Sequence, residues 1–293
     1  MLKVCITNFW EAFSLDEGFL KYLLDLSGEP WSVCGSQEQA DLVFTSVFPH
    51  APARFPHKTI CVIWENARPN YRFYHYSLSS DPDSYGGRNI RVPLWYTEIG
   101  WTPEYRRWNV SGGGSHGNEP LLHLPALLEP RTRPFRVRPR FCGFVASNPE
   151  SYRLMAAEAL GRIGEVEMFG PVAGTVDRRS KYEILRDHTF NLCFENSLFP
   201  GYHTEKLIQA WAAGAVPLYF GDSTVAQDFN PAAFLNAHDF PSLAAFAVEV
   251  ERLYKDRAAL EAMWRERLLL RAPSLTPAVW FLRQAIAAIH APN

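Results

Sequence analysis

The chain has 293 residues, of which 47% are hydrophobic and 14% aromatic, and its formal net charge is −2. This length allows one large or two medium domains with a sizeable core. The near-neutral charge argues against nucleic acid as the main partner, because binding to a phosphate backbone requires an excess of basic side chains.

The N-terminal third alternates short strands with helical spacing. Leu2–Thr7 is predicted to form a strand, and Asp16–Leu26 a helix that stops at Gly28 and Pro30. Three further apolar runs, each followed by a polar break, are typical of buried parallel strands: Trp31–Cys34, Asp41–Ser46 and Lys58–Trp64. We therefore expect a small α/β sheet here.

The middle of the chain, Trp101 to Pro134, has little periodicity and contains several glycines and prolines. It is predicted to be a long surface loop or an interdomain segment.

The C-terminal half returns to alternating strands and helices. Phe141–Val145 and Val166–Phe169 are predicted strands, and Ser147-Asn148-Pro149 is expected to cap a helix over Ser151–Leu160. Four more helices are predicted, at Lys181–Asp187, Ser242–Lys255, Ala258–Arg271 and Pro277–His290. Alternating elements in both halves predict an α/β protein of two Rossmann-like domains that face a cleft.

The most informative stretch is Thr189 to Gly221, which reads as one βαβ unit. Phe190, Leu192 and Phe194 alternate along a strand that ends at Glu195-Asn196. A loop with Pro200 and Gly201 follows, and Thr204 is expected to cap a helix that stops near Gly214. Ligands bind at such strand ends in open α/β sheets.

Polar side chains gather at this strand end. Asn196, Tyr202, Glu205 and Lys206 should converge near a helix start, where free backbone N–H groups favour anions. Arg153, at another helix start, adds a bidentate guanidinium. The two cations suit a diphosphate, whereas Glu205 suits sugar hydroxyls and Asn196 and Tyr202 suit ribose, base or sugar. The alternative is a solvated helix face.

The whole set of segments resembles a known family. FNLCFENS, GYHTEK, GAVPLYFGD, DFNP and HDF, within Phe190–Phe240, are similar to the donor-binding signature of the α-1,3/1,4-fucosyltransferases, glycosyltransferase family 10, as found in bacterial members. FVASNPESYR resembles that family's SNP-x-x-x-R segment, and WENARPNY resembles the segment around a glutamate regarded as the general base.

The resemblance implies a GT-B fold with GDP-fucose as the donor. Residues 135–293 would bind the donor and residues 1–134 the acceptor, with the last helix free to pack back on the N-terminal domain. Arg153 and Lys206 match the diphosphate ligands, while Asn196, Tyr202 and Glu205 match contacts to the nucleoside or fucose. Glu65 matches the base.

Inverting transfer from GDP-β-L-fucose fits these residues. A base must take the proton of the acceptor hydroxyl in a single displacement, and positive charge must stabilise the departing GDP. Glu65 supplies that carboxylate; the alternative is a structural glutamate paired with Arg68. His203 is expected to shape the loop rather than to catalyse.

No metal site is expected. Asp81-Pro82-Asp83 is formally D-x-D, but it lies in a turn-rich segment, so we interpret it as a surface turn. A divalent ion is not expected to be essential.

The hypothesis is an α-1,3-fucosyltransferase that acts on a GlcNAc-containing glycan. Candidates for stacking on the acceptor are Trp10, Trp31, Trp95 and Trp101. Two alternatives stay open: transfer from another GDP-sugar, and a glycan-binding protein without transfer activity.

The cysteines and the N-terminus bear on localisation. Most of the five cysteines lie in apolar runs without a CxxC pair, which favours buried free thiols in a reducing compartment. Met1 leads directly into a strand without a signal segment, and no apolar run is long enough to span a bilayer. We expect a cytoplasmic protein, with attachment to the periphery of the inner membrane left open.

Overall fold

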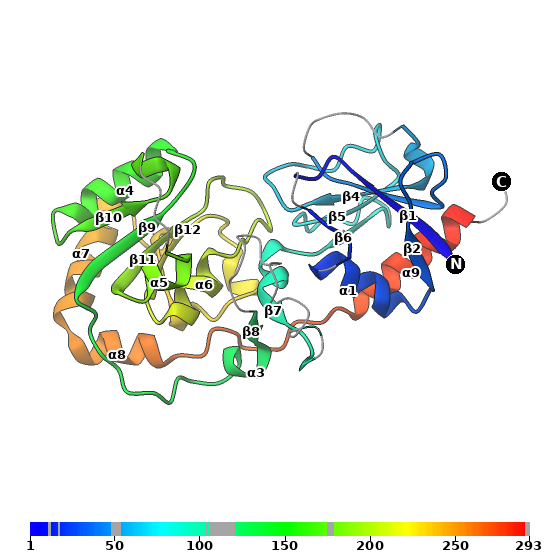
Figure 1. The fold of residues 1–293 in the computed structure, drawn as a ribbon. Coiled ribbons are helices and arrows are strands. Elements are labelled where there is room, and N and C mark those ends of the chain that lie inside the picture. Colours follow the sequence, from blue (N-terminus) through cyan, green and yellow to red (C-terminus); the bar gives the residue numbers. More distant parts are fainter. Residues whose placement is uncertain are drawn as a thin grey trace.

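The computed structural model describes residues 1–10, 13–16, 18–47, 54–103, 105, 121–174 and 179–290. Two parallel β-sheets, one from each half of the chain, lie beside each other with helices around them (Figure 1). This is the α/β architecture of two Rossmann-like units that the alternating pattern predicts.

The N-terminal sheet has the strand order β2-β1-β3-β4-β5-β6, and all of its pairs are parallel. Its strands are β1 (Leu2–Thr7), β2 (Trp31–Val33), β3 (Leu42–Thr45), β4 (Thr59–Ile63), β5 (Tyr76–Ser79) and β6 (Asn89–Arg91). Strands β3 and β4 are buried along their whole length, as central parallel strands should be. The 3₁₀ turn η1 (Pro56–Lys58) leads into β4.

The C-terminal sheet has the order β10-β9-β11-β12-β13 and is also parallel throughout. Its strands are β9 (Arg140–Val145), β10 (Val166–Phe169), β11 (His188–Phe194), β12 (Val216–Phe220) and β13 (Leu235–Asn236). The helices of this half are α4 (Ser151–Gly161), α5 (Lys181–Leu185), α6 (Lys206–Ala213), α7 (Leu243–Lys255) and α8 (Arg257–Arg265).

Strand β11 separates two apolar layers. Phe190, Leu192 and Phe194 join the cluster formed with α4, α7 and α8, whereas Cys193 joins the cluster formed with α6. Successive side chains of a strand point to opposite faces, which explains the alternation. Because helices cover both faces of the sheet at β11, the polar residues that follow the strand lie at the edge of the sheet rather than on a face.

The connections cross between the two halves twice. After η2 (Leu94–Glu98), the short parallel pair β7 (Ile99–Gly100) and β8 (Leu122–His123) and helix α3 (Leu124–Leu127) lie between the sheets. Helix α9 (Thr276–His290) then returns to the N-terminal half, where it packs against α1 (Gly18–Ser27) and β6. The division after residue 134 stays a prediction.

Several local expectations need correction. The N-cap of α4 is Glu150, with no capping side chain, so Ser147 and Asn148 do not cap it. Helix α8 ends at Arg265 rather than Arg271. The segment Trp101–Pro134, expected as a surface loop or an interdomain segment, holds β8 and α3 between the two halves, while its residues 104 and 106–120 lie outside the described part.

The five cysteines are all in described residues and are free thiols, four of them buried, in agreement with the sequence-based expectation. Among the described residues, no helix has both the length and the apolar character that a membrane crossing requires.

Candidate active site

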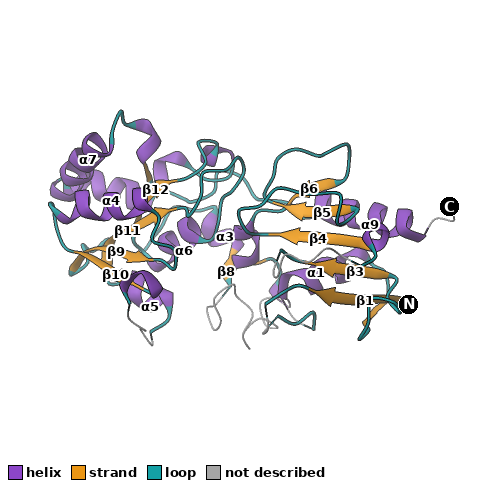
Figure 2. Cartoon of the chain, turned by 90° about the horizontal axis from the view of Figure 1, so that it is seen from above, coloured by secondary structure: helices purple, strands orange, loops and turns teal. Residues whose placement is uncertain are grey.

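The carboxyl ends of the two sheets face each other. In Figure 2, strands β4 and β5 point toward the C-terminal half, and the segments that follow them approach it. Arg68, which follows β4, stacks its guanidinium carbon 3.5 Å from the ring centre of Phe199, in the loop after β11. The edge between the two sheets is therefore where side chains from both halves meet.

Lys206 is the first residue of α6 and lies in a buried ionic contact. Its Nζ is 3.0 Å from Oε2 of Glu195, the residue directly after β11, whose exposed fraction is only 1%. Burial opposes the charged form of Lys206, but the carboxylates of Glu195 and Glu205 outweigh it and raise the lysine's pKa. Lys206 is therefore a permanent cation at this strand end.

Thr204 does not cap α6 as predicted. The N-cap is Glu205, without a capping side chain. The Thr204 hydroxyl donates to Glu195 Oε2 at 2.7 Å and its N–H donates to Oε1 at 2.9 Å. A buried carboxylate requires such donors, so the threonine satisfies Glu195 instead of the helix.

Glu205 extends the ionic contact to another helix. Its Oε1 lies 3.1 Å from Nζ of Lys181, in the first turn of α5, and 3.6 Å from Nζ of Lys206. The four residues Lys181, Glu205, Lys206 and Glu195 thus alternate in charge, and we call them the lysine–glutamate chain. The two ammonium groups thus share one oxygen of Glu205, Oε1, as a partner.

Arg153 lies close to the same carboxylates. It is almost fully buried in the first turn of α4, and its Nη1 donates to Asn148 O at 2.8 Å. Burial lowers the pKa of this guanidinium, while Glu195 and Glu205, among other groups, oppose that shift. Its Nε is buried without a hydrogen-bond partner. Arg153 and Lys206 therefore act on one pair of carboxylates, and Arg153 keeps an unused donor.

An aromatic cavity of about 310 Å³ lies at the end of β11 and is linked to these charges through Tyr152. Its wall includes Tyr152, beside Arg153, and Phe220, whose ring stacks on His238 with a centroid separation of 4.5 Å. The Tyr152 hydroxyl donates to Glu195 O. A flat ring system could lie in this cavity with its substituent directed at the cations.

Asn196 and Tyr202 both lie in the loop between β11 and α6. The Asn196 side chain has a buried Oδ1 without a hydrogen-bond partner. Tyr202 is buried, and burial raises the pKa of its phenol, with Glu65 among the charges that add to the rise. The exposed Glu65, which follows β4 after Trp64, therefore lies near this loop from the opposite half.

The Asp81-Pro82-Asp83 segment is held by protein contacts. Asp81 is buried, pairs with Arg68 and accepts from the Tyr85 hydroxyl at 2.6 Å. Burial opposes its ionisation, but these donors lower the pKa of Asp81. The described residues contain no group of three or more acidic, histidine or cysteine side chains that is suited to hold a metal ion.

Of the four tryptophans proposed for acceptor stacking, Trp95 is excluded. It is 2% exposed, its Nε1 donates to Asp228 Oδ2 at 3.0 Å, and its ring packs on Phe229. Trp10 is 47% exposed, and Trp31 and Trp101 are partly buried.

Glu195 and Lys181 were not selected from the sequence, although both contact predicted site residues. Glu195 was visible as the polar break after β11. Lys181 is 24 residues before Glu205 and carries no local signal, so only the fold brings the two together.

Known proteins confirm the resemblance. A family model described as glycosyltransferase family 10 (fucosyltransferase), C-terminal, matches residues 138–281, which run from β9 into the first part of α9 and include the lysine–glutamate chain. The α-(1,3)-fucosyltransferase FucT of Helicobacter pylori is 31% identical over 261 residues, 82% of this chain and 54% of that protein. The chain belongs to glycosyltransferase family 10.

Other family members and a solved structure agree. Human 3-galactosyl-N-acetylglucosaminide 4-α-L-fucosyltransferase FUT3 is 33% identical over 196 residues, 64% of this chain and 48% of that protein. The chain thus spans about half the length of these two curated relatives. A crystal structure of an α1,3-fucosyltransferase superposes with a TM-score of 0.75 at 26% identity, covering all of this chain and 93% of that one.

A crystal structure of an α1,3-fucosyltransferase with GDP-fucose has a TM-score of 0.71 at 24% identity and covers 97% of this chain and 90% of that one. These similarities place the two facing sheets in the GT-B fold.

Proposed function

We propose that this family 10 chain is an inverting α-1,3-fucosyltransferase that transfers L-fucose from GDP-β-L-fucose to a hydroxyl of a GlcNAc-containing glycan. The observation that carries the proposal is the position of Arg153 and Lys206. Both cations act on Glu195 and Glu205 at the end of β11, beside an aromatic cavity. An aromatic base linked to a diphosphate is the ligand that this combination suits.

In the proposed complex, guanine lies in the cavity next to Tyr152 and the Phe220–His238 pair. The diphosphate binds Lys206 and the unpaired Nε of Arg153. Glu205, held by Lys181, then accepts hydrogen bonds from the donor sugar, and Asn196 and Tyr202 line the same loop. The two cations stabilise the charge of the departing GDP without a divalent ion.

The reaction is a single displacement. The acceptor oxygen attacks the anomeric carbon of fucose as the bond from that carbon to the β-phosphate oxygen breaks, and GDP leaves with the electron pair. The proton of the acceptor hydroxyl passes to the Glu65 carboxylate. Glu65 suits this role because it comes from the N-terminal sheet, opposite the cations, and remains exposed.

The acceptor is proposed to bind at the N-terminal half, near Glu65. The name of the human relative, a 3-galactosyl-N-acetylglucosaminide 4-α-L-fucosyltransferase, supports a GlcNAc-containing acceptor. Calorimetry with GDP, followed by turnover of GDP-fucose on a glycan panel with and without EDTA, tests the donor, the acceptor and the metal together. Turnover of another GDP-sugar alone, or glycan binding without transfer, would support the two alternatives.

The base assignment has its own test. We expect Glu65→Gln to lower kcat by about 10²–10⁴-fold, the usual contribution of a general base, while GDP binding stays unchanged. Glu129→Gln, an exposed acid on the segment after α3, is the control and should keep full activity. Near-normal turnover by the Glu65 variant would refute the assignment.

A further inference from the structure

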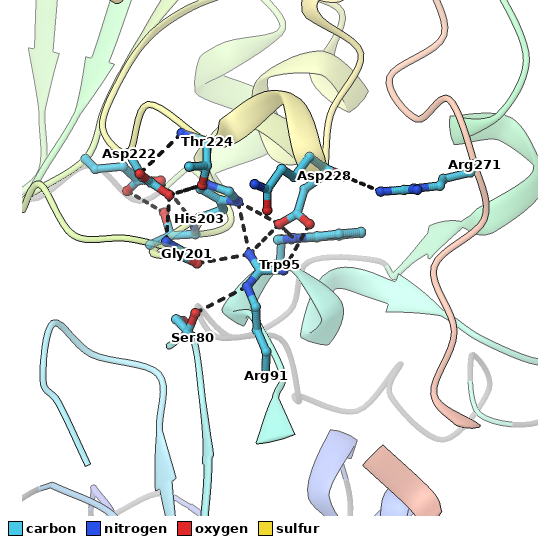
Figure 3. A network of polar contacts seen from close by, with 12 residues as sticks. Ser80, Arg91, Trp95, Gly201, His203, Asp222, Thr224, Asp228 and Arg271 are labelled. Carbon is cyan, nitrogen blue, oxygen red and sulfur yellow. Dashed lines mark hydrogen bonds and ion pairs between the residues drawn. The ribbon is translucent and has the colours of Figure 1, made fainter. Parts of the chain in front are cut away.

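The loop formed by residues 196–205 is fastened to the N-terminal half by a buried polar network (Figure 3). We call Arg91, Trp95, His203, Asp222 and Asp228 the interdomain network. Arg91, at the end of β6, binds both oxygens of Asp228, with Nη1–Oδ1 at 3.0 Å and Nη2–Oδ2 at 2.7 Å. The same guanidinium reaches Gly201 O at 3.1 Å and Ser80 O at 3.2 Å.

His203 lies at the centre of this network and is 1% exposed. Its Nδ1 is 2.6 Å from Asp228 Oδ2, and its Nε2 is 3.1 Å from Asp222 Oδ2. A neutral imidazole has a single N–H, so it would leave a bare nitrogen facing a carboxylate oxygen. Arg91 Nη2 also lies 3.1 Å from Nδ1, but the contact between Nδ1 and Asp228 is shorter, at 2.6 Å, and calls for a proton between these two atoms. The geometry therefore favours protons on both ring nitrogens, each donated to an aspartate.

The surrounding charges support the imidazolium form. Burial and the charge of Arg91 oppose it, but hydrogen bonds to Asp222 and Asp228 and the charge of Asp228 outweigh them and raise the pKa of His203. Burial also opposes ionisation of the two carboxylates, yet hydrogen bonds from His203 and other donors lower the pKa of both. The network contains two carboxylates and the guanidinium of Arg91. Its net charge is zero only when the His203 ring is protonated as well.

The other titratable groups near the network do not replace the imidazolium. Tyr219 on β12 interacts with both aspartates, and burial raises the pKa of its phenol. Tyr96 on η2 interacts with Asp228, and burial raises its pKa too. Both phenols stay neutral, and Arg271 contacts Gln227 O rather than the ring.

The network controls the backbone of the loop at Gly201. The Gly201 N–H donates to Asp222 Oδ2 at 2.6 Å, and its carbonyl accepts from Arg91. Tyr202 follows Gly201 directly, and Glu205 is two residues beyond His203. A change at the ring is therefore transmitted to two residues of the proposed donor site, although His203 itself contacts neither reacting atom.

We propose that His203 is a positioning residue, whose protonated ring ties the 196–205 loop to the N-terminal half and so holds Tyr202 and Glu205 in their donor-binding arrangement. This inference rests on the proposed function for its kinetic consequences. Its structural content, a doubly protonated ring that bridges two aspartates, stands independently. The ring acts through the loop backbone and the two carboxylates.

The pH dependence follows from the direction of the pKa shift. Because the pKa of folded His203 is raised above the ordinary value of about 6.5, the tie is complete below that pH and persists above it. It is lost as pH rises through the folded pKa, because the neutral ring leaves an uncompensated buried negative charge. Donor affinity should therefore weaken on the alkaline side.

The kinetic test uses His203→Gln. We expect the donor KM to rise about 10- to 100-fold, the effect of losing one hydrogen bond to a charged group, while the acceptor KM at saturating donor is unchanged. The alkaline weakening of GDP binding should disappear in the variant. The double variant His203→Gln/Asp222→Asn removes one charge of each sign and should regain part of the affinity.

A parallel pH profile in the wild type and in His203→Gln, or equal loss for both substrates, would overturn the proposal. If the wild type binds no GDP at any pH, the proposed function fails instead, and the two failures are distinguished.

The protonation state is tested without activity. In protein labelled with ¹⁵N-histidine, the signal that disappears in His203→Gln should keep two protonated nitrogens at pH values above about 6.5, where an ordinary histidine has lost one of its protons. Loss of the second proton at or below that pH would contradict the proposal even if the variant fails to fold well enough for kinetics. His75→Gln, on the surface of the N-terminal half, is the control and should remove a different signal.

Discussion

Two buried groups of alternating charge flank the 196–205 loop, and they differ in what they hold. The lysine–glutamate chain lies within the C-terminal half, and its two cations are long side chains that are 12% and 14% exposed. The interdomain network joins both halves, and its central cation is a short, 1% exposed imidazole. Both groups satisfy buried carboxylates, but through different kinds of cation.

This difference indicates that the lysine–glutamate chain binds the donor and that the interdomain network holds the loop in position. The flexible ammonium group of Lys206, which is 14% exposed, can exchange a carboxylate for a phosphate, because Nζ can rotate to a new acceptor. A planar ring between two fixed aspartates has no such freedom, so it holds the loop in place. Three substitutions test this comparison.

The largest effect is expected for Lys206→Met. Removing this cation leaves Glu195 buried without its ionic partner, so the free energy of unfolding should fall by about 3–5 kcal/mol. GDP binding should become undetectable by calorimetry. Urea unfolding measures the first effect. A Lys206→Met variant with normal GDP affinity would show that the lysine–glutamate chain does not bind the diphosphate.

The matched control is Lys255→Met on α7. Its partner Glu251 is also a glutamate, but the two side chains are 71% and 43% exposed. Such surface pairs contribute about 0–1 kcal/mol, so stability and GDP binding should barely change.

Gly201→Ala should have an intermediate effect and tests the positioning side. The φ of Gly201 is +79°, and an added Cβ would lie 2.2 Å from Ser80 O of the other half. Gly86→Ala is the control because it shares a positive φ, +68°, but meets no atom within 4 Å.

The control should cost about 1–3 kcal/mol of stability, the usual penalty for a strained backbone. Gly201→Ala should cost more and should also raise the donor KM. Equal unfolding free energies for the two variants would mean that the contact between the halves contributes nothing.

The smallest effect is expected for Lys181→Met. Glu205 would keep Lys206 but lose its 3.1 Å contact, so its orientation toward the donor sugar should relax. The KM for GDP-fucose should rise about tenfold, equal to ~1.4 kcal/mol, while the inhibition constant of GDP stays the same. An equal loss for GDP would place Lys181 on the phosphates. Lys181→Arg should retain most of the affinity.

The sequence predicted the elements around β11 well, because the information is local. Apolar alternation over Phe190–Phe194 and the glycine at position 214 define the strand and the helix end within a few residues, and Gly214 indeed has a positive φ of +90°. The converging site residues follow from the same rule, since parallel strands end at one edge.

The errors arise where a distant partner wins over a local preference. Thr204 is a residue type that commonly caps helices, but its hydroxyl donates to the buried carboxylate of Glu195 instead. Trp95 is a residue type that often stacks on sugars, but its indole N–H donates to the carboxylate of Asp228. Arg91 and Asp228 are 137 residues apart, and no periodicity links them. His203 was expected to shape the loop, and its contacts give that expectation a physical basis.

The return of α9 to the N-terminal half has a mechanical consequence. The two sheets are joined by two covalent tethers, one through β7, β8 and α3 and the other between α8 and α9. A single tether would permit rotation about many axes, whereas two tethers favour rotation about the line that connects them. We therefore expect the two halves to separate for product release by rotation about this line. The contact between Arg91 and Asp228 must break before they can do so.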